Sequence, residues 1–282
     1  MLKPILVSAF LCLALPFAHA ADLQVPAQMT AGTAFAIPAS GSGDASFYLI
    51  GPSSIVKRTV KLGMDIKVAG DEVQSAGRYV AIVCNGDGCS SKSFYVVAAD
   101  AAKISFLLHP SRVPVTAVNA INATAFVFDK YYNPVLRPVT VDFHVVPKTG
   151  PSFTKSVKSV QGVAWMQMSP TPKEGAVKVT AEVGASDEPR IIQQVASDAC
   201  NLRIHARRTA KGVEVETDPV KDCRGNAVPD GTVVSFTALG ATGRTTVDAP
   251  IKKGIARAEL PIAGNATISV ASGVVIGNEI RL

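Results

Sequence analysis

Two acidic corners with the same spacing are the first candidates for chemistry in this chain. Asp129 is followed four residues later by Asn133, and Asp222 is followed in the same way by Asn226. Oxygens on a loop could contribute to a calcium site, but calcium needs about six to eight of them and no dense acidic cluster lies nearby. We favour a structural role, in which Asp caps its own turn and Asn tolerates a left-handed backbone.

Each corner opens a longer repeat. Asp, Asn, Val and Phe recur at the same positions, so that Phe143 of the first copy matches Phe236 of the second. The match continues into glycine-led strands, which begin at Gly162 and Gly175 in one copy and at Gly254 and Gly264 in the other. The copies are about 90 residues apart, which is the size of one β-sandwich and too long for a solenoid unit.

The first twenty residues have the pattern of an export signal. Lys3 precedes an apolar run over residues 5–17, and Ala18-His19-Ala20 matches a cleavage site. The mature chain is therefore expected to start at Ala21 and to be periplasmic or extracellular. No later stretch has the roughly 18 consecutive apolar residues of a membrane span.

Four cysteines follow the expected cleavage site, and an oxidising compartment favours disulfides between them. Cys84 and Cys89 bracket a four-residue turn, and Cys200 and Cys223 lie 23 residues apart. We expect Cys84–Cys89 to close a hairpin. Cys200–Cys223 is expected to tie the start of the third domain to its corner and to stiffen the connection with the second domain. The spacings predict no metal site, no cofactor and no catalytic residues.

The only tryptophan is a candidate for a binding surface. The repeat places Ala164 and Met166 on an inward-facing side of their strand, so Trp165 is predicted to point outward. An exposed Trp is typical of an interface or a sugar platform. Packing of the ring under a neighbouring loop is an equally good interpretation.

Other possible binding residues lie on loops and on one strand. Tyr131 and Tyr132 lie in the first corner, where packing between domains is favoured over ligand contact. Arg203, His205 and Arg207 alternate onto one face, which could meet an anionic polymer or could be a charged, solvated edge strand. Asn85 and Asp87 lie at the tip between the first two cysteines.

The fold class predicted from these patterns is all-β, with tandem immunoglobulin-like sandwiches. Short alternating strands separated by Gly-rich turns predict domains over residues 21–99, 100–196 and 197–282, after the signal at 1–20. The expected strands are 33–37, 46–50, 56–62, 65–68, 77–84 and 91–98; then 104–108, 123–128, 139–146, 153–160, 163–168, 176–183 and 190–195; then 202–208, 213–216, 233–239, 245–247, 255–260, 266–271 and 276–282.

The third domain carries the run D-x-x-G-N-x-V-P-D-G-T-x-V-x-F from Asp222, followed by G-x-A-x-x-x-L from Gly254. These motifs resemble the bacterial Ig-like domain of the invasin and intimin type. The second domain departs from the pattern, with Tyr132 in place of Gly and Leu-Arg-Pro at 136–138. The resemblance implies sandwiches of about seven to nine strands that serve as a stalk or an adhesive module, without enzymatic activity.

The function expected from the sequence is that of a non-catalytic, exported binding or spacer protein, with a protein or a cell-surface or wall polymer as partner. The mature chain carries 27 Lys and Arg (28 less Lys3) against 22 Asp and Glu, a net charge of +5 that does not indicate a nucleic-acid partner. The alternatives are a carbohydrate- or cell-wall-binding accessory protein and a periplasmic chaperone that binds subunits by strand addition.

Overall fold

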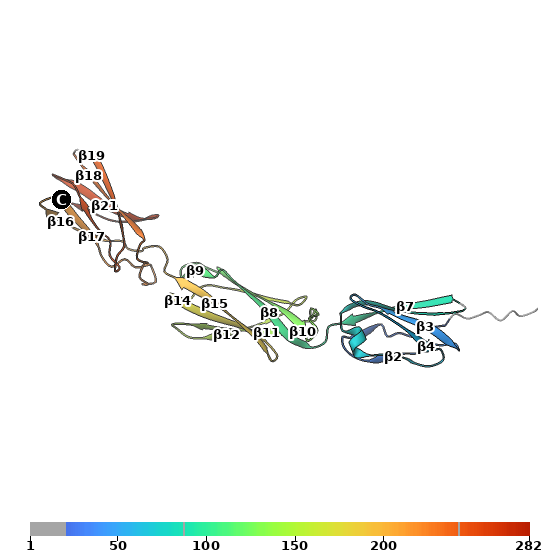
Figure 1. Cartoon of the computed structure of the whole chain (residues 1–282). Coiled ribbons are helices and arrows are strands. Elements are labelled where there is room, and N and C mark those ends of the chain that lie inside the picture. Colours follow the sequence, from blue (N-terminus) through green and yellow to red (C-terminus); the bar gives the residue numbers. More distant parts are fainter. Residues whose placement is uncertain (1–20, 87, 242) are drawn as a thin grey trace, which may run out of the picture. The chain divides into compact units, whose positions relative to one another are not determined.

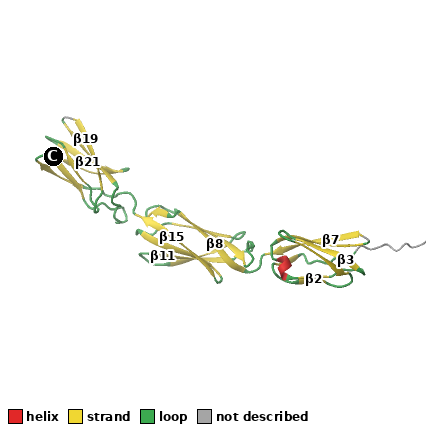
Figure 2. Ribbon diagram, viewed as in Figure 1, coloured by secondary structure: helices red, strands yellow, loops and turns green. Residues whose placement is uncertain are grey.

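The computed structural model describes residues 21–86, 88–241 and 243–282. The expected signal segment and Asp87 lie outside them. Figure 1 colours the strands along the sequence, and Figure 2 shows that regular structure is almost entirely strand. The only helix among the described residues is the four-residue 3-10 turn η1 (Gly70–Val73), and none of them forms a helix that is long and apolar enough to cross a membrane. The all-β prediction is confirmed.

The first compact unit contains the described residues up to Asp100 and, in addition, the corner segment Asp129–Asn133. Its larger sheet has the order β1-β7-β6-β3-β4, and β2 pairs with β5 in a second sheet. The strands are β1 (Gln28–Thr30), β2 (Phe35–Ile37), β3 (Asp44–Ile50), β4 (Ile55–Lys61), β5 (Ile66–Val68), β6 (Gly77–Asn85) and β7 (Gly88–Val97).

The second unit begins with a sandwich of two sheets, ordered β13-β10-β8 and β12-β11-β14-β15-β9. Its strands are β8 (Ala101–His109), β9 (Arg112–Pro114), β10 (Ile121–Asp129), β11 (Thr140–Pro147), β12 (Phe153–Lys158), β13 (Val163–Met168), β14 (Gly175–Val183) and β15 (Ser186–Val195).

The same unit ends with a sandwich whose sheets have the orders β16-β17-β20 and β19-β18-β21-β22. Its strands are β16 (Ile204–Thr209), β17 (Gly212–Thr217), β18 (Val233–Gly240), β19 (Gly243–Pro250), β20 (Arg257–Leu260), β21 (Ala266–Ser272) and β22 (Val275–Arg281). The sheets thus fall into three successive pairs, while the domain boundaries at 99/100 and 196/197 stay predictions.

The cores follow from strict alternation, because successive strand residues face opposite sides of a sheet. In β18, Val234, Phe236 and Ala238 are buried in the core of the last sandwich, whereas Leu239 faces outward. The repeat holds in three dimensions, since Phe143 pairs with Ala181 in the β11–β14 ladder and Phe236 pairs with Val270 in the corresponding β18–β21 ladder. The repeated Phe therefore marks the same core position in two sandwiches.

Two short strands were not predicted from the sequence. Strand β1 pairs in parallel with β7, and β9 pairs in parallel with β15. Each has only three residues, which is too short for an alternating pattern to stand out. Both lie at the edge of their five-stranded sheet, where Pro114 removes no N–H from the interior of the ladder.

The repeated core position gives a test of the fold. Phe236→Ala should lower the free energy of unfolding by about 3–5 kcal/mol, because it opens a cavity at a fully buried side chain. Leu239→Ala on the same strand is the control and should cost less than about 1 kcal/mol, since this side chain is 62% exposed. Chemical denaturation measures both, and equal losses would contradict the assigned register.

Candidate functional site

The first corner is organised by a buried carboxylate. Asp129 has no solvent-accessible surface, and its Oδ1 accepts hydrogen bonds from the backbone N–H groups of Tyr131 (2.8 Å) and Asn133 (2.9 Å). Its Oδ2 accepts from Asn133 Nδ2 (2.8 Å) and from the backbone N–H of Ala99 (2.9 Å). The Asp cap expected for the turn is therefore present, and it extends to a distant backbone segment.

The Asn133 side chain makes a second set of contacts within the first unit. Its Nδ2 donates to the carbonyl of Gln74 (2.7 Å), and its Oδ1 accepts from the N–H of Ala76 (2.7 Å). One amide thus satisfies both a carbonyl and an N–H of the loop that precedes β6. The Asn133 amide bonds only backbone atoms of this loop, so these two hydrogen bonds do not depend on the loop's side chains.

The second corner repeats this arrangement in the second unit. Asp222 Oδ1 accepts from the N–H groups of Arg224 (2.8 Å) and Asn226 (2.9 Å), and Oδ2 accepts from Asn226 Nδ2 (3.0 Å) and from the N–H of Ser197 (3.0 Å). Asn226 Nδ2 donates to the carbonyl of Pro172 (3.0 Å), and its Oδ1 accepts from the N–H of Glu174 (3.2 Å). The loop it binds precedes β14, as the first loop precedes β6.

One sequence interpretation of the corners was wrong. Asn was expected to occupy the left-handed backbone region, but that conformation belongs to the preceding residue, Tyr132 (φ 66°) in one copy and Gly225 (φ 79°) in the other. Gly adopts this region without steric cost, whereas Tyr does not. The Asn is selected instead because its side chain is both donor and acceptor.

The groups around the two carboxylates stabilise the negative charge of the carboxylate itself and do not provide a cation site. Four N–H groups point at each carboxylate, whereas a cation would need further oxygen ligands there. Burial alone would raise the pKa of Asp129 and Asp222, but the hydrogen bonds from the Asn side chain and the backbone outweigh it and lower the pKa of both. No group of three or more His, Cys, Asp or Glu able to hold a metal occurs among the described residues.

The two tyrosines of the first corner have different roles. Tyr131 packs against the core of the first unit, and its hydroxyl lies so close to Gly32 that an added Cβ would be 2.0 Å away. Tyr132 is 68% exposed. Packing is therefore the role of Tyr131, and ligand contact stays open only for Tyr132. Asn85 is the last residue of β6, at the opposite end of the strand from Gly77, and it is half-buried.

Both expected disulfides are present. Cys84 and Cys89 are directly opposite in the β6–β7 ladder, and Cys200 bonds Cys223, which lies between Asp222 and Arg224 in the second corner. On the loop-entropy model these bonds stabilise the chain by about 2 and about 3.4 kcal/mol. The second bond ties Cys200 to the corner whose Asp222 carboxylate accepts a hydrogen bond from the Ser197 N–H.

Trp165 lies on the outer face of the sheet β13-β10-β8, as predicted, and is 55% exposed. It is directly opposite Thr124, between the cross-strand pairs Asn122–Gln167 and Phe126–Val163. The outward residues of these strands thus combine aromatic rings with amide and hydroxyl groups. Such a surface can stack on a sugar ring and hydrogen-bond its hydroxyls.

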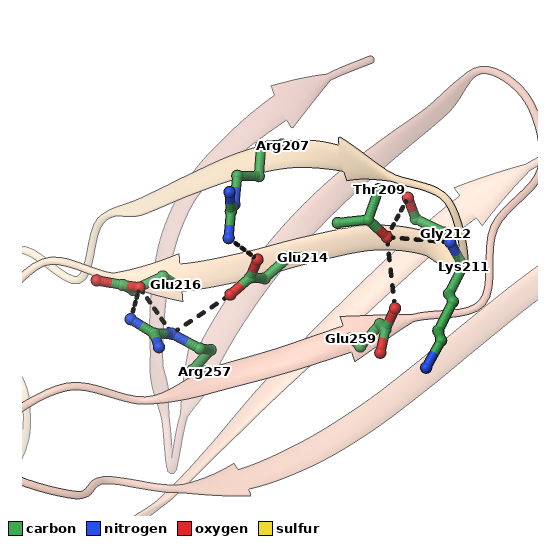
Figure 3. A network of polar contacts seen from close by, with 8 residues as sticks. All are labelled: Arg207, Thr209, Lys211, Gly212, Glu214, Glu216, Arg257 and Glu259. Carbon is green, nitrogen blue, oxygen red and sulfur yellow. Dashed lines mark hydrogen bonds and ion pairs between the residues drawn. The ribbon is translucent and has the colours of Figure 1, made fainter.

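The basic strand of the last sandwich is neutralised by its neighbours (Figure 3). Strand β16 is at an edge, and Arg207 forms an ion pair with Glu214 of β17, directly opposite. Glu214 also lies 3.6 Å from Nε of Arg257, which donates to Glu216 (2.8 Å). The arginines of this face are therefore interleaved with carboxylates.

The two other residues predicted for the basic strand differ from each other. His205 Nε2 lies 2.8 Å from Asp218 Oδ1, whereas Arg203 precedes β16 and is exposed. Glu259 of β20 contacts the hydroxyl of Thr209 at 3.4 Å (Figure 3). Carboxylates on β17 thus offset the charges of Arg207 and Arg257, which favours the solvated edge-strand interpretation over binding of an anionic polymer.

The buried carboxylates predict a pH dependence of stability. The unfolded Asp binds protons near a pKa of about 3.9, whereas the folded pKa of Asp129 and Asp222 is lower. Their contribution is therefore complete above about pH 5 and is lost as the pH falls through the folded pKa. Thermal unfolding at pH 7 and pH 3 should show a smaller acid-induced loss in Asp129→Asn/Asp222→Asn than in the wild type.

A matched control for this measurement is Asp44→Asn, because Asp44 is exposed at the start of β3. This variant should lose as much stability in acid as the wild type. If the double corner variant also behaves like the wild type, the corner carboxylates do not have lowered pKa values.

Comparison with known proteins adds information on the fold. No protein-family model and no curated protein matches the chain. Among solved structures, the Escherichia coli adhesin FdeC matches with a TM-score of 0.63 and 14% identity over 93% of this chain and 95% of that one.

Two further matches cover a similar share of this chain at lower TM-scores. InvD of Yersinia pseudotuberculosis has a TM-score of 0.49 and 11% identity over 93% of this chain and 96% of its own. Invasin, a bacterial integrin-binding protein, has a TM-score of 0.48 and 13% identity over 91% of this chain and 57% of its own. The FdeC match confirms the resemblance at the level of the fold: the chain is built of the immunoglobulin-like sandwiches found in bacterial adhesins.

Proposed function

We propose that this protein is a non-catalytic, exported module of tandem immunoglobulin-like domains that binds or presents a partner at the cell surface or in the periplasm. The observation that carries this proposal is the duplicated Asp–Asn corner, which in both copies is bonded to a backbone loop of the sandwich before it in sequence. In the second unit this corner fastens one sandwich to the next, which suits a spacer. The fold match to an adhesin and the two disulfides support export.

The spacer role can be tested in the second unit. Asn226→Ala removes both hydrogen bonds to the loop at 172–174, so the distribution of interdomain distances in solution scattering should broaden. Asn265→Ala is the control, because Asn265 is exposed in the same sandwich, and it should leave the distribution unchanged. Identical curves for the two variants would count against a spacer held by its corners. Reduction of Cys200–Cys223 in the same measurement tests whether that bond stiffens the connection.

A second candidate function is carbohydrate or cell-wall binding through the outer face of β13-β10-β8. It rests on the exposure of Trp165 beside Thr124 and Gln167, which supply a ring and hydrogen-bonding groups on one surface. The basic strand offers less, because Arg207 is already paired with Glu214 and the nearby Arg257 with Glu216.

Trp165→Ala should therefore abolish retention on peptidoglycan or a glycan array if this face binds sugar, because stacking on the indole would be lost. Phe153→Ala is the control, since Phe153 is also an exposed aromatic residue but lies on β12 of the other sheet. Equal retention of wild type and both variants would remove the second candidate, and copurification of an exported subunit by strand addition would instead favour a chaperone.

A further inference from the structure

A third loop of the chain ends in the same way as the two loops that bind the corners. The bound loops end at Gly77 and Gly175, with φ of 144° and 133°, and the loop at 261–264 ends at Gly264 with φ 147°. These values lie in the region that glycine adopts readily. Gly264 also matches Gly175 in the repeat, and each glycine leads into the strand that pairs with the Phe-bearing strand of its sandwich.

The atoms that bind a corner are the carbonyl three residues before the glycine and the N–H one residue before it. They belong to Gln74 and Ala76 in the first loop and to Pro172 and Glu174 in the second. The corresponding atoms in the third loop are the Pro261 carbonyl and the Ala263 N–H. Both residues are exposed, and no hydrogen bond within the described part of the chain occupies either atom.

The surroundings of this loop suit an acidic corner. A hollow of about 380 Å³ lies between the loop and the β16–β17 turn, and Arg208 and Lys211 are the charged residues that line it. Arg208 donates to the Gly264 carbonyl (2.9 Å) and so occupies neither the Pro261 carbonyl nor the Ala263 N–H. In the second unit, Lys173 similarly reaches a corner, with its Nζ 3.2 Å from the Arg224 carbonyl.

We propose that the loop at 261–264 is a docking site for the Asp-x-x-x-Asn corner of another immunoglobulin-like domain. The incoming Asn amide would donate to the Pro261 carbonyl and accept from the Ala263 N–H. Both corners of this chain are already bonded to their own loops, so the occupant is a corner of a domain outside residues 21–282. This inference goes beyond the proposed function, because it assigns a surface and the chemistry that fits it.

The test joins a second copy of residues 193–282 directly after Leu282. Arg281 pairs with Thr267, so continuing the same ladder places the partner of Gly264 two residues beyond Leu282. In the extended chain that residue is the Gln194 of the added copy. The original Gln194 is opposite Gly175 in the same way. The amide exchange of Ala263, followed by NMR, should slow at least about tenfold, since its N–H becomes hydrogen-bonded. The tether supplies the effective concentration that two hydrogen bonds need.

Two variants show whether a corner causes the change. Asn226→Ala in the added copy should return Ala263 to its original exchange rate, whereas the same substitution in the first copy should leave Ala263 slow. The proposal is overturned if Ala263 does not slow while the Phe236 amide of the added copy is protected. It is also overturned if Ala263 slows in both variants, because something other than the corner then covers the loop.

A second extension keeps the test decisive if the first added copy does not fold. It carries residues 95–196, whose corner contains no cysteine, and Val96 then takes the place opposite Gly264, as it does opposite Gly77. Asn133→Ala in that added copy is the corresponding variant, with the same expected and contradicting outcomes.

Discussion

A buried carboxylate that accepts four N–H hydrogen bonds is the interaction on which each corner depends. Taking an unpaired carboxylate out of water would cost far more than a single hydrogen bond returns. At Asp129 the cost is offset by bonds from its own turn, from Asn133 and from Ala99. The carboxylate thereby fixes the turn, the orientation of the Asn amide and the position of a segment 30 residues earlier in the chain.

The disulfide of the last sandwich acts on the same structure. Cys223 lies inside the second corner, and Cys200 lies three residues after Ser197, whose N–H binds Asp222. The covalent bond and the hydrogen bond therefore hold one segment against one turn. The first corner has no disulfide, and there Tyr131 packs on the hydrophobic core beside Gly32. Packing in one copy and a covalent bond in the other thus reinforce the same polar arrangement.

Much of the fold could be predicted from the sequence, because alternating strands and Gly-rich turns are local signals. The pairing of Cys84 with Cys89 and the outward direction of Trp165 were predicted for the same reason. The role of Asn133 could not be, since its partner Ala76 lies 57 residues away and contributes only backbone atoms. The internal repeat did hold one clue, because Gly225 of the second copy matches Tyr132 of the first and marks the left-handed position. The charge balance on β16 could not be predicted either, because the pairing of Arg207 with Glu214 depends on the hairpin register, which the sequence does not specify.

The Asn amide recognises a carbonyl and an N–H, which every loop of suitable shape presents whatever its side chains. Gln-Ser-Ala in one loop and Pro-Lys-Glu in the other are bound through the same atoms. An interface of this kind does not require two partners to change together. Genetic duplication, deletion or exchange of whole domains can therefore alter the number and order of sandwiches while each new neighbour still fits, so the length of such a protein can change without redesign of its joints.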